Sequence, residues 1–450
     1  MRPRPFAERS RSELSASTSL SERVNLKLSR LKWVAVFLIW VLMSNILSVN
    51  NYHYRRGGSD VVYLEHAELM ETEGWRNAFF SMHHPKNLPT LWSEYFVDEI
   101  EFGYAYSLSQ KVSMASKVIY SFEAQRKLRR LIKDYRPDVA HLHCIYHHLS
   151  PAIIPVLKNE GIPIVMTAHD LKIACPAYKM LNSEGICELC NHGSVWNVIK
   201  HRCVRNSLAA SAIVAVESGL HRYLDTYRKN MDRVVVPSRF FVEKFVQWGW
   251  PREKLVYVPN YVDVTKFEPQ FTPGNYFLYF GRLAPEKGVG TLIRAAAKSG
   301  VLLKIVGTGP VEAELKTLAA QVGGAIEFLG YRTGSELHDL VRDSRAVVLP
   351  SEWYENAPMS VLESYALGKP VIGARIGGIP EMIVDGETGW TFESQNVENL
   401  AECLQTVIAA DNSMIMSMGQ VGRDYVEKNF SRQRYIEAIL ALYKELGVKG

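Results

Sequence analysis

Short apolar runs alternate with helix-like segments along most of the chain. Each run has the length of one strand, and five fall in each half of the sequence. The runs are NILSV (45–49), NAFFSM (77–82), DVAHLH (138–143), IPIVMT (162–167), RVVVP (233–237), NYFLYFG (275–281), VLLKIVG (301–307), AIEFLG (325–330), RAVVLP (345–350) and KPVIGA (369–374). Strands that alternate with helices are typical of a parallel sheet covered on both faces. The pattern predicts an α/β fold of two similar halves, each built on a doubly wound parallel sheet.

A stretch rich in proline and aromatic residues, 251–273, separates the two halves and has the composition of a linker. The first domain is therefore expected over 43–250 and the second over 274–430. The tail 431–450 contains YIEAILALYKEL, which predicts an amphipathic helix used for packing. Doubly wound sheets bind ligands beyond the carboxyl ends of their strands, so functional residues are expected in the turns that follow the strands.

An N-terminal segment accounts for the excess of positive charge. The chain has 450 residues, of which 47% are hydrophobic and 22% charged, a composition that excludes a disordered chain. Its formal net charge is +5, but residues 1–32 carry eight basic and three acidic side chains, and the rest of the chain carries 44 of each. The balanced charge of both halves gives no support for a nucleic acid partner.

Residues 1–42 precede the first predicted strand and join this basic segment to an apolar run, Trp33–Leu42. The run is too short to span a bilayer and has no small-residue cleavage site. Two interpretations stay open: translation starts at Met43, or the segment is a basic hook at the membrane surface. A spanning anchor over Trp33–Val49 is the third alternative. The expected location is the cytoplasm, at the cytoplasmic face of the membrane if the hook exists.

The first apolar run of the second half leads into a cationic turn, GRLAPEKG (281–288). Arg282 and Lys287 lie five residues apart on this turn, and two cations there could neutralise a diphosphate. The structural alternative is a solvated loop ahead of a helix that begins at Gly288.

The run RAVVLP leads into SEWYENAPMSVLE (351–363). Pro358 fits the first position of a helix, where a missing N–H costs little. The helix would then offer free N–H groups to an anion at Met359, Ser360 and Val361. Glu355 and Glu363 lie eight residues apart and could hold different parts of one elongated ligand. Together with the cationic turn, this arrangement is typical of a sugar-nucleotide site.

Three segments in order, GRLAPEKG, the pair Glu355 and Glu363, and GGIPEMIVDGETGW (377–390), resemble the retaining GT-B glycosyltransferases of glycosyltransferase family four, also called glycosyl transferases group 1. The resemblance covers roughly residues 45–445. It implies two Rossmann-like domains facing a central cleft, and transfer of a hexosyl unit from a nucleotide diphosphate sugar to an acceptor hydroxyl with retention and without a catalytic metal. The GGIPE turn is expected to be structural.

The resemblance also implies roles for the residues of the second half. Arg282 and Lys287 would stabilise the leaving nucleotide diphosphate, with Gly281 at the start of the same turn. Glu355 would contact the transferred sugar, and Glu363 the ribose of the nucleotide.

In the first half, the resemblance points to a glycine pair and a histidine. Gly57 and Gly58 match the glycine-rich first turn, where the lack of a side chain lets the backbone approach the diphosphate. His169 matches the histidine of an HD pair at a strand end and would donate to the sugar or phosphate. The alternative for His169 is a buried histidine hydrogen-bonded to Asp170. The histidines of HLHCIYHH (141–148) resemble a metal cluster, but core or acceptor-site roles are expected for them.

One loop holds four of the six cysteines: Cys175, Cys187, Cys190 and Cys203. Four thiols with a CxxC can close a tetrahedral structural zinc site. Free thiols and disulfides are the alternatives, and a cytosolic setting disfavours disulfides. No cofactor is expected for catalysis itself, and the chain contains no Asp-x-Asp, GxGxxG or GxxxxGK.

The acceptor is expected to be a saccharide or a lipid-linked saccharide, and the product a cell-surface glycan such as a lipopolysaccharide or exopolysaccharide. The aromatic and basic segment 92–130 could support peripheral membrane association, with a solvated helix face as the alternative. Two other functions stay open: a GT-B sugar-nucleotide epimerase, which needs no acceptor, and a catalytically idle sugar-nucleotide-binding scaffold.

Overall fold

The computed structural model describes residues 43–100 and 107–449. The interpretations of residues 1–42 lie outside this range. Residues 44–450 form one unit that carries both sheets. No helix of the described residues has the length and apolar character needed to cross a membrane.

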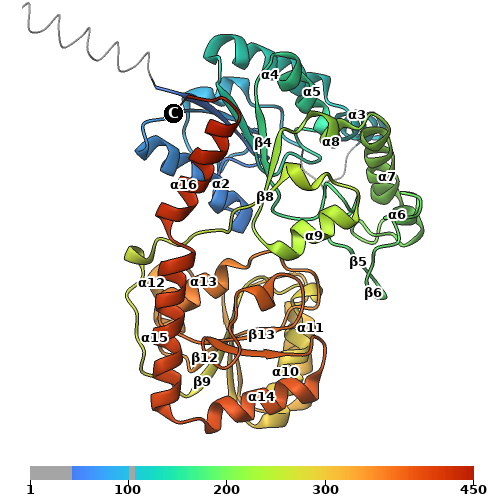
Figure 1. Ribbon diagram of the computed structural model, residues 1–450. Helices are drawn as coiled ribbons and strands as arrows, with labels where there is room; N and C mark the ends of the chain where they lie inside the picture. Colours follow the sequence, from blue (N-terminus) through green and yellow to red (C-terminus); the bar gives the residue numbers. More distant parts are fainter. Residues whose placement is uncertain (1–42, 101–106, 450) are drawn as a thin grey trace, which may run out of the picture. The chain divides into compact units, whose positions relative to one another are not determined.

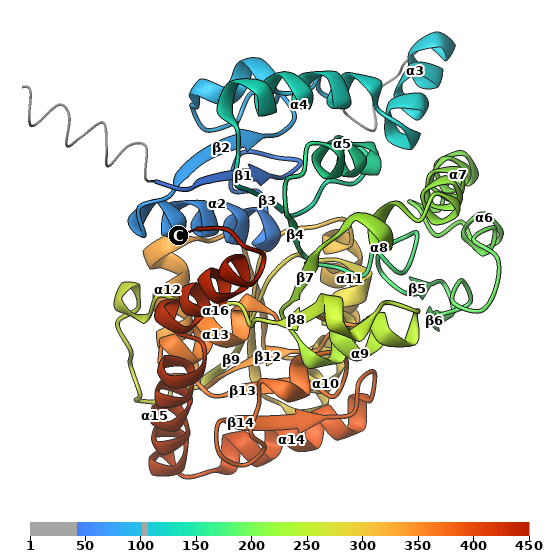
Figure 2. The same cartoon turned by 45° about the horizontal axis from the view of Figure 1, so that its top comes forward.

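The first half carries a six-stranded parallel sheet (Figures 1 and 2). Its strands are β1 (Asn45–Val49), β2 (Arg76–Phe80), β3 (Val139–Leu142), β4 (Ile164–Thr167), β7 (Arg233–Val236) and β8 (Leu255–Tyr257), in the order β2-β1-β3-β4-β7-β8. Five of them follow the predicted apolar runs. The sixth, β8, lies inside the stretch 251–273 that was expected to be a linker, because three residues between prolines look no different from linker sequence. A small hairpin, β5 (Leu181–Asn182) and β6 (Gly185–Ile186), lies apart from this sheet.

The second half carries another six-stranded parallel sheet. Its strands are β9 (Tyr276–Phe280), β10 (Leu302–Val306), β11 (Ile326–Gly330), β12 (Ala346–Leu349), β13 (Val371–Ala374) and β14 (Gly389–Phe392), in the order β11-β10-β9-β12-β13-β14. This is the Rossmann strand order. The strand β14, which begins at the last two residues of the GGIPEMIVDGETGW segment, was not predicted because its short sequence GWTF has no continuous apolar run.

The helices cover both faces of each sheet, as the α/β pattern predicts. They are α2 (Gly58–Thr72), α3 (Leu108–Ile119), α4 (Phe122–Tyr135), α5 (Ile154–Asn159), α6 (Asn197–Lys200), α7 (Leu208–Tyr223), α8 (Thr226–Asn230), α9 (Arg239–Gln247), α10 (Val289–Ser299), α11 (Glu312–Val322), α12 (Gly334–Arg342), α13 (Met359–Ala366), α14 (Val397–Ala409), α15 (Asn412–Asn429) and α16 (Arg432–Glu445). Alternate residues of β9 enter separate cores: Phe277 and Tyr279 pack with α10 and α14, and Tyr276 and Leu278 with α13.

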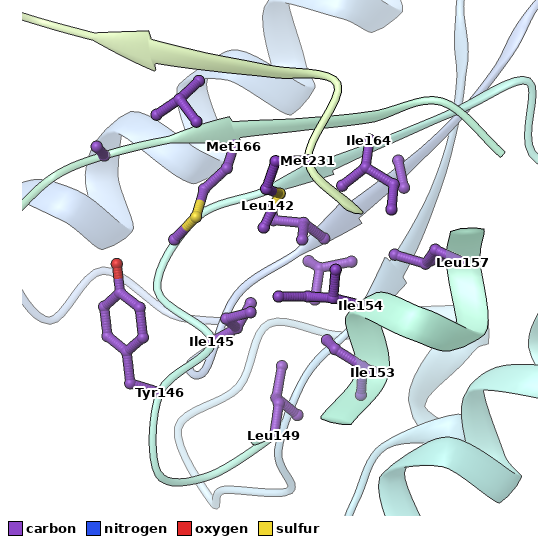
Figure 3. Packing of buried hydrophobic residues seen from close by; sticks show 14 of the residues in the cluster. Leu142, Ile145, Tyr146, Leu149, Ile153, Ile154, Leu157, Ile164, Met166 and Met231 are labelled. Carbon is purple, nitrogen blue, oxygen red and sulfur yellow. The ribbon is translucent and has the colours of Figure 1, made fainter. Parts of the chain in front are cut away.

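The first sheet also has a separate apolar core on each of its two faces. On one face of the sheet, Leu142 of β3 and Met166 of β4 pack against Ile153 and Ile154 at the start of α5 (Figure 3). On the other face, residues such as Ile46 pack against α2 and α16. The strands can be apolar throughout because both of their faces are buried.

The C-terminal helix α16 packs on the first sheet although it follows the second half in sequence (Figures 1 and 2). Ser431 caps it, and Tyr435, Ile439 and Tyr443 enter the same core as Ile46. The amphipathic pattern predicts a packing helix but gives no information about the surface that it covers.

The strand order reverses at one place in each sheet. In the first sheet this switch point lies between β1 and β3, and in the second between β9 and β12. Ligands of doubly wound sheets bind beyond the carboxyl ends of the strands at such points. The turns after these four strands are therefore the places for a binding site.

Candidate functional site

The cationic turn follows β9 and is held against the end of β12. Residues Pro285–Lys287 form one turn of 3-10 helix, and Gly288 has a φ of 66°. A Cβ on Gly288 would come within 1.8 Å of the carbonyl oxygen of Pro350. The close approach and the positive φ both require glycine here. Gly288 is the N-cap of α10, and the helix itself begins one residue later, at Val289.

Arg282 forms an ion pair with Glu286 on the same turn, and its side chain is 58% exposed. The Glu286 carboxylate is buried, and Lys179 from the first half also donates to it, at 3.0 Å. Burial raises the pKa of Glu286, but backbone and lysine hydrogen bonds and the charges of Lys179 and Arg282 outweigh burial and lower it overall. The exposed guanidinium is therefore held in place by one carboxylate and keeps a face open to solvent.

Lys287 and Glu355 contact each other directly. The Lys287 Nζ donates to the Glu355 Oε1 at 2.6 Å, and the Ser351 hydroxyl donates to the same oxygen at 2.7 Å. Burial raises the pKa of Glu355, but the Lys287 charge and these hydrogen bonds outweigh burial and lower it overall. The cation expected at the diphosphate and the carboxylate expected at the sugar are thus joined as an ion pair.

The GGIPE turn supports the backbone of Glu355. The Gly378 N–H donates to the Glu355 carbonyl at 2.8 Å. A Cβ on Gly377 would come within 2.4 Å of the Glu355 carbonyl oxygen, and one on Gly378 within 1.9 Å of that of Asn356. The two glycines allow backbone segments to touch, which agrees with the expected structural role.

Asn356 connects the second half to the first beside His169. Its amide donates to the carbonyl of Ala168 at 2.9 Å, and its Oδ1 accepts from the Ser238 hydroxyl at 2.8 Å. Glu381 makes a second connection, because its carboxylate accepts from the backbone N–H of Arg239 at the start of α9, at 2.8 Å. Neither Asn356 nor Glu381 was among the predicted site residues. The sequence marks them only by position: Asn356 follows Glu355, and Glu381 is the last residue of the GGIPE motif.

The N-terminus of α13 differs slightly from the expectation. Pro358 is the cap and Met359 the first helical residue. The Val361 N–H was predicted to be free for an anion. It instead donates to the Pro358 carbonyl at 3.1 Å. In the part of the chain that the structure describes, Met359 and Ser360 keep amide N–H groups without an acceptor. Two of the three predicted donors remain.

Glu363 lies further along α13 and is half-buried. Burial raises its pKa to about 7, and the negative charge of Glu65 on α2 adds to the shift. The two predicted carboxylates therefore have opposite environments: one is held ionised and the other is close to titration at neutral pH.

The raised pKa of Glu363 predicts a pH-dependent gain in stability from Glu363→Gln. The folded state holds a proton on Glu363 that the unfolded state, with an ordinary pKa of 4.5, releases, so stability falls as pH rises from about 4.5 to 7. The ionised carboxyl then costs on the order of 3 kcal/mol above pH 7. We expect Glu363→Gln to raise the melting temperature at pH 8 and to change it little at pH 4.5, as measured by circular dichroism. The exposed Glu253→Gln is the control, and an equal effect of both variants at pH 8 would contradict this environment for Glu363.

Gly57 and Gly58 begin α2 after β1, at the switch point of the first sheet. Gly57 is extended, with a φ of −158°, and a Cβ on it would meet only Asp60, at 3.9 Å. A Cβ on Gly58 would meet nothing within 4 Å. Neither packing nor backbone conformation requires glycine at these positions, so the space above the turn is open to a ligand.

His169 follows β4 and contacts another histidine, not Asp170. Its Nε2 lies 2.8 Å from the Nδ1 of His143, which follows β3. Burial lowers the pKa of His169 to about 4. Asp170 instead accepts from the backbone N–H of Lys172 at 2.9 Å. The alternative in which Asp170 binds the His169 side chain is therefore not what the structure shows.

The four loop cysteines are free thiols. Cys175 and Cys190 are buried in separate apolar clusters, and the other two are half-buried. Among the described residues, no three histidine, cysteine, aspartate or glutamate side chains are placed to hold a metal ion. The described geometry thus shows no ready-made ligand set at Cys175, Cys187, Cys190 and Cys203, and structural zinc in this loop stays a prediction.

Several cations of the segment 92–130 are paired with carboxylates. Lys117 and Lys127 both contact Glu123 and Asp98, and Arg130 contacts Glu94 at 2.7 Å. Intramolecular pairing lowers the charge available to an anionic surface and favours the solvated helix face of the two alternatives.

Comparison with known proteins identifies the chain. Residues 56–266 match the model of Glycosyltransferase Family 4, and residues 263–424 match that of Glycosyl transferases group 1. A glycosyltransferase of Methanocaldococcus jannaschii, itself uncharacterised, is 25% identical over 65% of this chain and 84% of its own length. The lipopolysaccharide core biosynthesis glycosyltransferase LpsE of Rhizobium meliloti is 29% identical over 48% of this chain and 65% of its own length.

Solved structures share the fold. HepE of Anabaena, in complex with UDP and glucose, has a TM-score of 0.62 at 17% identity and covers 89% of this chain and all of its own length. Sucrose-phosphate synthase of Thermosynechococcus elongatus has a TM-score of 0.63 at 18% identity, over 90% of this chain and 99% of its own. With both sheets, the motif turns and the two family matches in agreement, the chain belongs to glycosyltransferase family four, the glycosyl transferases group 1, and has the GT-B fold.

Proposed function

We propose that the protein is a retaining glycosyltransferase that moves a hexosyl unit from a nucleotide diphosphate sugar to an acceptor hydroxyl. The observation that carries the proposal is the Lys287–Glu355 ion pair beyond the carboxyl ends of β9 and β12, with Arg282 on the same turn. At the switch point of the second sheet, the pair places a cation that could bind a phosphate beside a carboxylate that could bind a sugar hydroxyl.

The ion pair fits the binding of a charged sugar donor. Phosphate oxygens compete with the Glu355 carboxylate for the Lys287 ammonium, because both are anionic acceptors of similar geometry. A donor that engages Lys287 frees Glu355 to accept a hydrogen bond from a sugar hydroxyl. Arg282 adds a second cation on the exposed side of the turn. On this proposal, donor binding exchanges one charge pair for another and leaves no buried charge unpaired.

The proposed reaction is a front-face displacement at the anomeric carbon. The bond between that carbon and the departing phosphate oxygen breaks, the acceptor oxygen forms its bond on the same face, and the acceptor's proton goes to the departing phosphate. Glu355 is a poor candidate for an enzyme nucleophile, since Lys287 and Ser351 both donate to it. Catalysis would come mainly from Arg282 and Lys287, which stabilise the negative charge that develops on the phosphate without a catalytic metal.

The relatives support a role in cell-surface glycan synthesis. They include the lipopolysaccharide core enzyme LpsE and WcaL of Escherichia coli, named as a putative colanic acid glycosyltransferase, which is 27% identical over half of this chain. HepE was solved with UDP and glucose. We propose a saccharide or lipid-linked acceptor, reached in the cytoplasm at the membrane face.

The test is nucleotide release from UDP-, GDP- and ADP-sugars by the full-length protein, with and without a lipid extract or oligosaccharide acceptor. Release that depends on an acceptor, with an α-linked product from an α-linked donor by NMR, supports the proposal. Conversion of the donor without an acceptor would indicate the epimerase, and binding without turnover the scaffold; either result overturns the proposal. A β-linked product would contradict retention.

A further inference from the structure

His169 is one member of a stack of histidine rings behind the proposed donor site. The ring centroids of His141 and His143 lie 4.9 Å apart, and those of His143 and His169 lie 5.1 Å apart, with 20° between the planes in each case. His66 of α2 packs against the first two rings at 4.4 and 5.8 Å. The stack places the Nδ1 of His143 at 2.8 Å from the Nε2 of His169.

The rings behind His169 are held in place by hydrogen bonds. Thr167 contacts the Nε2 of His141 at 2.7 Å, and the Tyr443 hydroxyl of α16 contacts its Nδ1. Tyr63 of α2 packs edge-on against His143, at 5.4 Å between centroids. His143 is therefore confined by a ring on each side and by Tyr63, and its Nδ1 cannot leave His169 without repacking this cluster.

All of these rings are neutral near pH 7. Burial lowers the pKa of His169 to about 4 and that of His66 to about 3, and it holds the pKa values of His141 and His143 well below the ordinary range. A neutral imidazole has one nitrogen that donates and one that accepts. In the contact between His143 and His169, one ring must therefore donate to the other.

The second nitrogen of His143 decides the direction of this bond. The Nε2 of His143 is buried and has no partner among the described residues. If the proton were on Nε2, the protein would contain a buried N–H without an acceptor, which is rarer in folded proteins than an acceptor without a donor. The proton is therefore placed on Nδ1, where His143 donates it to the Nε2 of His169.

We propose that His143 is a positioning residue that holds His169 in the tautomer protonated at Nδ1, so that His169 offers an N–H to an oxygen of the bound donor. The statement about the tautomer concerns the chain alone, whereas the statement about the donor rests on the proposed function. A carboxylate in the place of His143 could only accept, so it would fix the opposite tautomer, with the proton on Nε2, and would stabilise the imidazolium. A histidine partner fixes the tautomer and leaves His169 neutral, so its N–H can donate without a positive charge that would hold the departing diphosphate.

The direct test is NMR of the full-length protein labelled with ¹⁵N-histidine, at pH 7.5 and without ligand. The ring nitrogen shifts distinguish the two tautomers, and His169→Asn assigns the His169 signals. We expect His169 to carry its proton on Nδ1 in the wild type. A proton on Nε2 of His169 would overturn the inference. This measurement needs no variant of His143 and no activity.

Two variants of His143 separate positioning from packing. His143→Phe keeps a stacked ring but has no nitrogen, and His143→Asn keeps an amide donor near the place of Nδ1. We expect His143→Phe to give a mixture of His169 tautomers and to lower kcat about 10- to 100-fold, by analogy with the loss of a hydrogen-bond partner that orients a metal-binding histidine. His143→Asn should restore the single tautomer and most of kcat. Equal behaviour of the two variants in both measurements would show a packing role only and overturn the inference.

The outcomes also distinguish the inference from the proposed function. The Nδ1 tautomer in a protein that transfers no sugar to any acceptor would support the positioning role and contradict the transferase. Acceptor-dependent transfer by a protein whose His169 is protonated at Nε2 would do the reverse.

Discussion

Replacing Lys287 by alanine is expected to lower kcat by about 10²- to 10³-fold, the usual effect of removing one preorganised donor from a developing oxyanion. The expected loss has two causes, and both follow from the Lys287–Glu355 ion pair. The variant loses the ammonium proposed for the departing phosphate, and it leaves the Glu355 carboxylate with Ser351 as its remaining side-chain donor. Initial rates of nucleotide release at saturating donor and acceptor measure the effect. Arg282→Ala is expected to fall in the same range.

The matched control is Lys298→Ala. Lys298 lies on α10, is 54% exposed and pairs with Glu398 on the surface at 2.9 Å. It carries the same charge on the same stretch of chain but lies away from β12, so its loss should leave kcat unchanged. Turnover by Lys287→Ala close to that of the wild type, in a protein with an unchanged melting temperature, would remove the basis of the proposed mechanism.

Replacing Lys172 by methionine is expected to destabilise the protein by about 3–5 kcal/mol, the cost of leaving one member of a buried ion pair alone. The side chains of Lys172 and Glu217 are 2% and 1% exposed, and their charged atoms lie 2.7 Å apart. The Lys172 ammonium also donates to the Pro176 carbonyl at 2.9 Å. Without it, the Ser218 hydroxyl, at 3.0 Å, would be the one side-chain donor left to the Glu217 carboxylate among the described residues. Urea unfolding measures the change.

Two further variants test this explanation. The double variant Lys172→Met with Glu217→Leu removes both charges and should recover much of the loss. Lys158→Met removes one member of a partly exposed pair, Lys158–Asp232 at 2.7 Å, and should cost less than about 1 kcal/mol. Equal losses from Lys172→Met and Lys158→Met would show that burial does not determine the value of these pairs.

Strands were predictable where the sequence has a continuous apolar run. All ten predicted runs form strands, because most strands of a doubly covered parallel sheet are buried on both faces and are mainly apolar. The hairpin strands β5 and β6 were missed, and so was one strand of each large sheet, β8 and β14. Both β8 and β14 lie at the edge of their sheets, where a strand has one neighbour and can be short. The pattern thus detects strands with a continuous apolar run, including the partly exposed β11, and fails for short strands that have none.

The turns of the site were predictable, but their contacts were not. Motif spacing placed Arg282, Lys287 and Glu355 at strand ends, and the strand order brings those ends together. Spacing along one turn gives no information about a partner 68 residues away, so the Lys287–Glu355 ion pair needed the structure. The orienting role proposed for His143 depends on two strand ends and a buried nitrogen, which no local sequence pattern encodes.

The placement of α16 sets an order for the maturation of the newly made chain. The apolar face of the first sheet that contains Ile46 is covered by Tyr435, Ile439 and Tyr443, which are synthesised after the second sheet. At about 5–20 residues per second, the roughly 180 residues between the first half and α16 take on the order of 10–40 s to synthesise. During that interval the apolar face of the first sheet that α16 later covers is exposed to solvent. If the ribosome stalls within the second half, this face stays accessible to chaperones and proteases.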